Sequence, residues 1–361
     1  MKVLILTVLL LIGGGVSEAA GQGPTDRQIA EHFAPVFHQG LGSSPRSDYI
    51  TKFDFDGDWR GDNNWANAAD PGFPLRAYIY YAVSQTRTHY FIHYAVFHPR
   101  DYKGGEARGP LLSDLLRTGA GIVGERDPTG LLSEATSAHE NDMEGALVVA
   151  AKNGKDLANA RVDYLQTLSH NRFLPYSRAG SAEGSTSFIA EGNNVVLYIE
   201  PRGHGIQAHV VDGATADTRN TLIYRFTGKA EDPEVKRESP VGYDLLPIQT
   251  TLWPLARAHV KKKGQKYGAI HAYQPVKISL ENAAGRVHPR TINIGSLGSA
   301  FLGTVGGRNM ARPPWGWFDI NRREDPLGLW FFDPAHVIKR DFGLGGSFST
   351  VYTKLPFWAA P

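Results

Sequence analysis

The chain has 361 residues, of which 42% are hydrophobic and 20% are charged, as in a packed protein and unlike a disordered chain, a collagen or a coiled coil. Thirty-eight Lys and Arg against 36 Asp and Glu leave a net charge of +2, far from the basic surface that nucleic-acid binding requires. Disulfides, thiolate zinc sites and cysteine nucleophiles are excluded because the sequence has no cysteine.

The first twenty residues are typical of a secretory signal peptide. Met1-Lys2 precedes an apolar run, residues 3–12, and small residues follow it up to Ala20. This run is too short for a membrane anchor, which needs roughly 20 apolar residues. We therefore expect cleavage near Ala19 or Ala20 and a secreted mature chain, extracellular or periplasmic.

Runs rich in β-branched and aromatic residues, each bounded by Gly, Pro, Asn or Asp, predict strands along most of the mature chain. These runs are residues 77–84, 89–98, 145–151, 195–200, 208–211, 221–226 and 268–273. Short helices are expected at residues 26–33, within 111–118 and within 252–262. We expect residues 21–361 to form a single, mainly β domain, an antiparallel β-sandwich with helical insertions and long loops. The insertions are expected near 103–137 and 232–266.

Side chains that can bind a metal ion gather just before the predicted strand 145–151. If the chain is already extended at Asp142, then Asp142 and Glu144 project from the same face and a divalent cation could bridge them. His139, three residues earlier, could fold back onto the same ion. Two carboxylates and an imidazole suit Mg²⁺ or Ca²⁺, with Mn²⁺ or Zn²⁺ as alternatives. The other interpretation is a polar turn with solvated acidic side chains.

Four segments in this order resemble the necrosis- and ethylene-inducing-peptide-like proteins, which are secreted cytolysins of plant-associated microbes. The family has a "YAWYFPKD" strand, the heptapeptide "GHRHDWE", a "VVVWI" strand and later a His-Gly pair. The counterparts here are Tyr94–Asp101, His139–Glu144, Ala146–Ala150 and Val195–Gly205. The heptapeptide's leading Gly is Ala138 here, its second His is Asn141 and its Trp is Met143.

The resemblance implies a divalent-cation site at Asp101, His139, Asp142 and Glu144, with His204 beside it. It also implies a β-sandwich with a negatively charged cavity at one end. The implied activity is cation-dependent docking to polar lipid head groups or glycans, followed by damage to the membrane. The family's disulfides are absent from this chain.

A second acidic cluster precedes the first predicted strand. Asp54, Asp56 and Asp58 alternate and Asp62 follows, a spacing that suggests a second cation site, with calcium as the ion. Alternatively, these aspartates cap local amides in a turn-rich segment, or they line the same cavity as Asp101 and Glu144.

Trp315 and Trp317 lie in a loop rich in Pro and Gly. Such tryptophans could form an exposed platform for a sugar or a membrane surface, or they could pack into the end of the sandwich. Packing is the favoured interpretation, and these two residues are the best candidates for surface aromatics if the platform exists.

Two functions of different class follow from these features. The first is a secreted, divalent-cation-dependent binding or membrane-damaging protein whose ligand is a lipid head group, a glycan or another small polar molecule. The second is a secreted metal-dependent hydrolase of phosphoester or glycan substrates, with His204 or Glu140 as acid or base. The sequence does not separate an enzyme from a binding protein.

Overall fold

The computed structural model describes residues 23–101, 138–178, 182, 185–209, 220–262, 266–305 and 311–357. The expected signal peptide, residues 1–20, and the expected insertion 103–137 lie outside these residues. Within the described part, no helix has the length and apolar character needed to cross a membrane.

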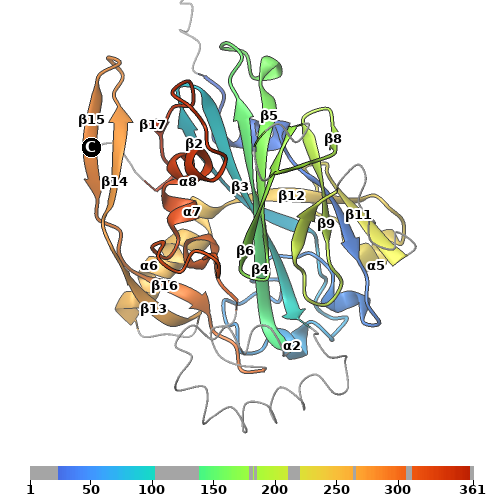
Figure 1. Ribbon diagram of the computed structural model, residues 1–361. Helices are drawn as coiled ribbons and strands as arrows, with labels where there is room; N and C mark the ends of the chain where they lie inside the picture. The colour runs from blue at the N-terminus through green and yellow to red at the C-terminus, as the bar shows by residue number, and fades with distance from the viewer. Residues whose placement is uncertain are drawn as a thin grey trace, which may run out of the picture.

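The fold is mainly β, as expected (Figure 1). In the described chain, fifteen strands form one hydrogen-bonded sheet with the main order β10-β9-β1-β11-β12-β2-β3-β4-β5-β6-β7. The strands of this main path are β1 (Val36–Gly40), β2 (Tyr78–Thr86), β3 (His89–Asp101), β4 (His139–Ala151), β5 (Arg161–Ser169), β6 (Arg172–Ser177), β7 (Thr186–Ser187), β9 (Asn194–Ile199), β10 (Ile206–Ala208), β11 (Thr221–Phe226) and β12 (Val241–Pro247).

The remaining strands lie beside this path or apart from it. They are β8 (Ala190–Glu191), β13 (Tyr267–Tyr273), β14 (Val276–Glu281), β15 (Val287–Ile292), β16 (Gly295–Phe301) and β17 (Val351–Lys354). Strands β13 and β16 form a separate two-stranded sheet. The helices are α1 (Asp26–His32), α2 (Asn64–Asn67), α5 (Pro233–Lys236), α6 (Leu252–Lys262), α7 (Leu329–Phe332) and α8 (Pro334–Asp341). Short 3-10 turns are η1 (Pro45–Ser47), η2 (Leu157–Asn159), η5 (Ile248–Thr250) and η6 (Pro314–Gly316).

The sheet is mixed, so the expected antiparallel arrangement does not hold throughout. Strand β1 runs parallel to β9, β12 runs parallel to both β11 and β2, and β14 runs parallel to β17. These pairs join segments that are distant in the chain, and local sequence patterns carry no information on such pairings. Part of the expected insertion 232–266 forms β12, which lies inside the sheet between β11 and β2.

Strands β3 and β4 form the centre of the molecule, and both of their faces are covered. Alternate residues point to opposite sides of a strand, and almost all residues of both strands are buried. Two separate hydrophobic cores result. The inner core is shared by α1, by β2 to β5 and by the strands β1, β9, β10, β11 and β12, so the two halves of the curled sheet enclose it.

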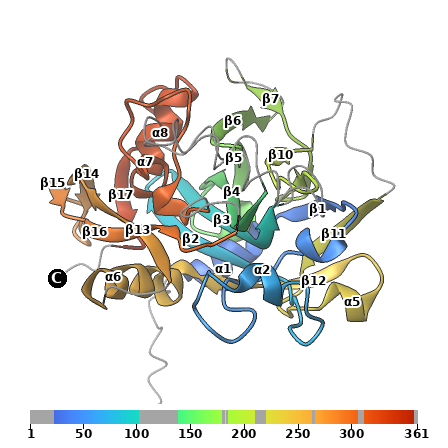
Figure 2. The same ribbon diagram turned by 90° about the horizontal axis from the view of Figure 1, so that it is seen from below.

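The C-terminal third provides the second core on the outer face of β2, β3 and β4. Figure 2 shows β13 to β17 with α6, α7 and α8 on one side of these central strands and β1, β11 and β12 on the other. Trp330 is fully buried there, and its ring stacks on Phe173 at 4.5 Å between ring centres.

The two candidate surface tryptophans belong to this outer core. Trp315 is 0% exposed and Trp317 is 2% exposed. Their indole N–H groups donate to the backbone carbonyls of Gly298 and Met143 at 2.7 and 3.0 Å. An exposed aromatic platform at Trp315 and Trp317 is therefore wrong, and the alternative interpretation of core packing is confirmed.

Candidate functional site

Polar side chains gather at one end of β3 and β4, where the inner core ends. The antiparallel register places Asp101 opposite His139 and His98 opposite Asp142. Two loops complete this end of the molecule, one between β9 and β10 and one that follows η1. We call the four carboxylates found here, Asp48, Asp101, Asp142 and Glu144, the acidic cluster; each is at most 8% exposed.

Asp142 and Glu144 contact the β9–β10 segment from the same strand, as their alternation predicts. The Oδ2 atom of Asp142 lies 3.0 Å from Nδ1 of His204. The carboxylate of Glu144 accepts the backbone N–H groups of His170 at 2.9 Å and of Ile206 at 3.2 Å. Both acids are buried, so the interpretation of a turn with solvated acidic side chains is wrong.

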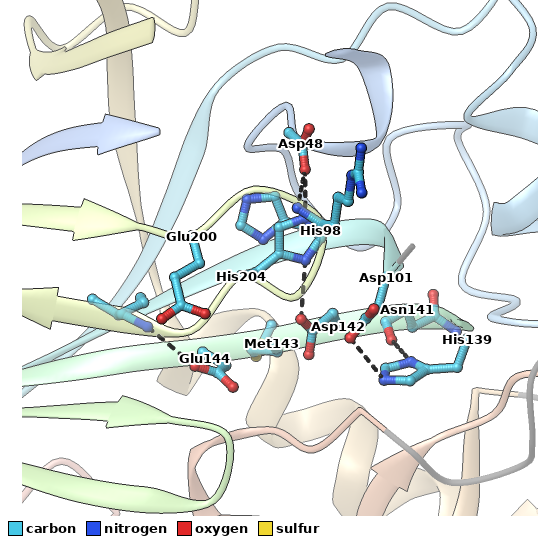
Figure 3. Close-up of polar contacts among 12 residues, drawn as sticks. Asp48, His98, Asp101, His139, Asn141, Asp142, Met143, Glu144, Glu200 and His204 are labelled. Atoms are coloured by element: carbon cyan, nitrogen blue, oxygen red, sulfur yellow. Dashed lines mark hydrogen bonds and ion pairs between the residues drawn. The ribbon is translucent and has the colours of Figure 1, made fainter. Parts of the chain in front are cut away.

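His204 is fully buried and bridges two aspartates (Figure 3). Its Nδ1 donates to Asp142, and its Nε2 donates to Oδ1 of Asp48 at 3.2 Å. Burial opposes a charge on the ring, yet the hydrogen bonds and charges of the two carboxylates raise the pKa of His204 to about 10. His204 is therefore an imidazolium at neutral pH, and it offsets part of the negative charge of the cluster.

Asp48 is a member of the cluster that sequence reasoning missed. Its carboxylate accepts the backbone N–H groups of Gly42 at 2.6 Å and Arg202 at 2.7 Å, in addition to His204. It therefore ties three chain segments together. No spacing around Asp48 distinguishes it in the sequence, and only the fold brings it to His204.

His98 is the second residue that the sequence did not single out. Its ring stacks on that of His204 with 3.8 Å between centres and an angle of 6° between planes. Its Nε2 donates to Oε1 of Gln39 at 2.9 Å. Burial and the neighbouring charge of His204 lower the pKa of His98 well below its ordinary value, so His98 is neutral. The only signal in the sequence is its position three residues before Asp101.

Asp101 and His139 form a second pair across β3 and β4. The Nε2 atom of His139 lies 3.4 Å from Oδ2 of Asp101. The Nδ1 atom of the same ring donates to the backbone carbonyl of Asn141 at 2.8 Å. This bond fixes the ring so that Nε2 faces the carboxylate, which is the orientation of many metal-binding histidines.

Glu140, a candidate acid or base, has a different environment. Its carboxylate accepts the backbone N–H groups of Trp65 and Thr304, both at 2.7 Å, and that of Val305 at 3.4 Å. The hydroxyl of Thr304 lies 3.2 Å away. Burial raises the pKa of Glu140, whereas these donors favour its ionised form. Glu140 thus joins the start of β4 to two distant loops.

Replacing Glu140 by Gln should lower the free energy of unfolding by about 1–2 kcal/mol, because buried backbone donors would lose a charged acceptor. Urea unfolding measures this change. The same substitution at Glu191, in an exposed pair with Arg225, is a matched control that should change stability by no more than about 0.5 kcal/mol. Equal stabilities of the two variants would contradict the role of Glu140.

Backbone conformations that are costly for ordinary side chains collect around the acidic cluster. In the described chain six residues other than glycine have a positive φ, and one of them, Arg237, lies elsewhere. The other five are Asn141 (φ 60°), His170 (51°), Asn171 (58°), Arg202 (72°) and His204 (52°). His170 and Asn171 form the two-residue turn between β5 and β6, where a positive φ is ordinary. Asn141, Arg202 and His204 remain as costly conformations beside the acidic cluster, and they support it as the site of the protein.

Carboxylate and imidazole groups are suitable ligands for a divalent cation. One pair, Asp101 and His139, also has a spacing close to that of two ligands of one ion. Ligands of one ion lie about 3 Å apart when their bonds are 2.0–2.4 Å long, and the His139–Asp101 distance of 3.4 Å is close to this value. In the described part of the chain, no group of three or more His, Asp or Glu side chains is arranged to hold a metal ion. Asp142 contacts His204 and Glu144 accepts backbone N–H groups, whereas Asp101 and His139 lie against each other.

The second acidic cluster makes local hydrogen bonds. Asp56 accepts the backbone N–H of Asp58 at 3.1 Å and the amide of Asn67 at 2.6 Å. Asp58 accepts the backbone N–H of Arg60 at 2.6 Å. Asp54 and Asp62 pair with Lys52 and Arg60 at 3.1 and 3.0 Å. These contacts match the interpretation of a capped turn, and a calcium site at this segment remains a prediction.

No protein-family model matches the sequence, and no curated protein matches it significantly. Solved structures do match parts of it. Necrosis and ethylene inducing protein 2, from the causal agent of cocoa's witches' broom disease, is 16% identical, with 53% of this chain and 72% of that chain covered and a TM-score of 0.28. NLPPya in complex with mannosamine is 15% identical, with 54% of this chain and 71% of that chain covered and a TM-score of 0.30. The non-toxic protein HaNLP3 is 14% identical, with 63% of this chain and 77% of that chain covered and a TM-score of 0.27.

These structures are of the same group of proteins that the sequence motifs indicate. The resemblance to necrosis- and ethylene-inducing-peptide-like proteins is thus found again among solved structures, as a divergent likeness over about half of the chain. Because identity and TM-scores are low, we infer the function of this chain from its own residues.

Proposed function

We propose that the protein is a secreted binding protein of necrosis-inducing type that uses a divalent cation to dock polar lipid head groups or glycans. The orientation of His139 beside Asp101 carries this proposal. The backbone carbonyl of Asn141 holds the proton on Nδ1, so the lone pair of a neutral ring is on Nε2, 3.4 Å from a carboxylate oxygen. A carboxylate and an imidazole in this arrangement suit Mg²⁺, Mn²⁺, Ca²⁺ or Zn²⁺.

The charge of the cluster supports the same conclusion. The acidic cluster holds four buried carboxylates, and two of them, Asp48 and Asp142, contact the imidazolium of His204. Burial of anions is costly, so positive charge at the cluster is favourable. A bound cation would lower this cost. It would also present coordination positions to hydroxyl or phosphate oxygens of a ligand, because Asp101 and His139 would fill only two of its positions.

The chemistry of the two candidate acid–base residues does not favour a hydrolase. His204 is held between two aspartates with a pKa of about 10, so at neutral pH it cannot accept a proton. Glu140 is occupied by backbone donors from two loops. Their contacts suit structural roles, and a binding protein remains the better supported function.

Replacing Asp101 by Asn should weaken binding of the divalent cation at least tenfold, because a hard cation loses one charged ligand. Asp142→Asn should weaken it as well through the charge of the cluster. Calorimetry with Mg²⁺, Ca²⁺, Mn²⁺ and Zn²⁺ measures the affinities. Asp163→Asn, in an exposed pair with Arg161, is the matched control and should leave the affinity unchanged.

Dye release from vesicles tests the docking step. We expect release from vesicles that contain glycosylated sphingolipid, little release from phosphatidylcholine alone, and loss of release when a chelator is added. Soluble glucosamine and mannosamine serve as competitors. Release that a chelator does not change, or a wild-type protein that binds none of the four ions, would overturn the cation-dependent function.

A further inference from the structure

A groove of about 910 Å³ opens at the end of β2, β3 and β4 that lies away from the acidic cluster. Lys152, directly after β4, is separated from Asp142 by ten residues, which span roughly 30 Å along an extended strand. The groove is therefore distinct from the candidate cation site. Its lining includes Glu31, His32, Gln85, Tyr90, Lys152 and Lys155.

Lys152 is half-buried in this groove without an opposite charge beside it. Its ammonium group donates to Oε1 of Gln85 at 3.2 Å and to the backbone carbonyl of Thr86 at 2.8 Å. It also lies 4.3 Å from the centre of the Tyr90 ring. Among the described residues, no carboxylate forms an ion pair with Lys152, and burial lowers its pKa to about 8.

The lining of the groove holds two lysines, Lys152 and Lys155, and two acids, Glu31 and Asp156. Glu31 is paired with Arg27 at 2.5 Å, and Asp156 accepts the backbone N–H of Ala158 at 2.9 Å. Lys155 is exposed and has no ion pair with any described residue. Burial lowers the pKa of His32, so this ring is neutral at pH 7. The charges of the lining therefore balance, but among the described residues neither acid forms an ion pair with Lys152.

We propose that this groove binds a small ligand through an oxyanion, a carboxylate or a phosphate, placed against Lys152. An ammonium group that is partly removed from water gains most from an anion at hydrogen-bond distance. Lys155, three residues further along the chain, adds a second positive charge at the edge of the groove. The site goes beyond the proposed cation-dependent function and does not depend on it.

Two amide side chains of the lining suit a hydroxylated ligand such as a sugar acid or a sugar phosphate. The Oε1 atoms of Gln28 and Gln85 accept hydrogen bonds from Thr25 and Lys152, so their NH₂ groups remain donors for hydroxyl oxygens. A volume of about 910 Å³ is sufficient for one or two sugar rings.

Titration of the full-length mature protein with galacturonate, galactose and inorganic phosphate tests the site, with binding followed by calorimetry and thermal shift. Galacturonate differs from galactose mainly by its carboxylate. We expect binding of galacturonate, phosphate or both, and none of galactose. Binding of galacturonate alone would identify the ligand as a sugar acid. Binding of phosphate alone would identify it as a phosphate ester. Equal binding of galactose and galacturonate, or no binding of either anion, would overturn the proposal.

Variants then locate the anion. Lys152→Gln should weaken binding at least tenfold, Lys152→Arg should retain most of it, and Lys155→Gln should have a smaller effect. Lys229→Gln is the control, since that side chain is 80% exposed and outside the groove. In the wild-type protein, bound anion should also slow acetylation of Lys152 and leave acetylation of Lys229 unchanged. This measurement does not depend on the folding of any variant. Unchanged affinity in Lys152→Gln, or acetylation of Lys152 at the same rate with and without anion, would contradict the site.

Discussion

Replacement of His204 by Asn is expected to lower the free energy of unfolding by about 3–5 kcal/mol, the range for removal of one partner from a buried ion pair. The fully buried imidazolium donates to Asp48 and Asp142, so its loss leaves two buried carboxylates without their shared cation. Asparagine tolerates the left-handed backbone at this position, φ 52°. Urea unfolding in the presence of a chelator measures the effect without compensation by a metal ion.

His170→Asn is the matched control for this substitution. His170 also has a left-handed backbone, φ 51°, and also pairs with a carboxylate, Glu200, but it is 36% exposed. We expect a loss of no more than about 1 kcal/mol there. The double variant His204→Asn with Asp142→Asn should be more stable than His204→Asn alone, because one of the two uncompensated charges is removed. A loss at His204 no larger than that at His170 would contradict the bridging role.

The stability supplied by His204 also has a defined pH range. Its pKa is raised in the folded protein to about 10 from an unfolded value of 6.5. The folded state therefore binds more protons between these values, and stability falls as pH rises from about 6.5 to 10. His204→Asn should reduce this slope relative to the wild-type protein, which urea unfolding at pH 7 and pH 9 can measure.

The chemical core of the site could be predicted from the sequence because it lies within one strand. Strand period alone places Asp142 and Glu144 on the same side of β4, and the structure confirms this. The resemblance placed His204 beside these acids, and it contacts Asp142. Only the start of β4 was predicted too late, because the polar segment before residue 145 gives no hydrophobic signal.

The partners of these residues could not be predicted, because they come from distant parts of the chain. Asp48 and His204 are 156 positions apart, and the loop that contains Asp48 has no metal-ligand spacing. The same limit applies to the sheet. Pairing of β1 with β9, or of β12 with β2, follows from how the sheet curls, and each strand taken alone is compatible with parallel and antiparallel neighbours.

The departures from the family heptapeptide have a common physical explanation in the structure. Glu140 accepts the amides of Thr304 and Val305, and Asn141 donates to the carbonyl of Leu302 at 2.9 Å. The carbonyl of Met143 accepts the indole N–H of Trp317. All three positions contact the C-terminal third, which covers the outer face of β4. The side chains of Glu140 and Asn141 therefore contact this cover and that of Met143 packs into the outer core, whereas Asp142 and Glu144 keep the face of the acidic cluster.

The protein is expected to lose stability steeply in mild acid, by about 3–4 kcal/mol between pH 7 and pH 5 from His89 and His93 together. Burial lowers the pKa of each to about 4, against 6.5 in the unfolded chain. Between these values the unfolded state binds protons that the folded state does not, so stability falls as pH decreases. His93 is fully buried and alone accounts for about 2 kcal/mol of the loss at pH 5.

His93→Gln separates this effect from general acid sensitivity. Glutamine can keep the hydrogen bond that Nε2 of His93 donates to the carbonyl of Trp330 at 3.0 Å, but it does not titrate. The variant loses ring contacts with Trp330 and Phe331 and should be less stable than the wild-type protein at pH 7. Its further loss between pH 7 and pH 5 should nevertheless be about 2 kcal/mol smaller. Urea unfolding of both proteins at the two pH values provides the comparison, and identical pH dependences would mean that the pKa of His93 is not lowered in the folded state.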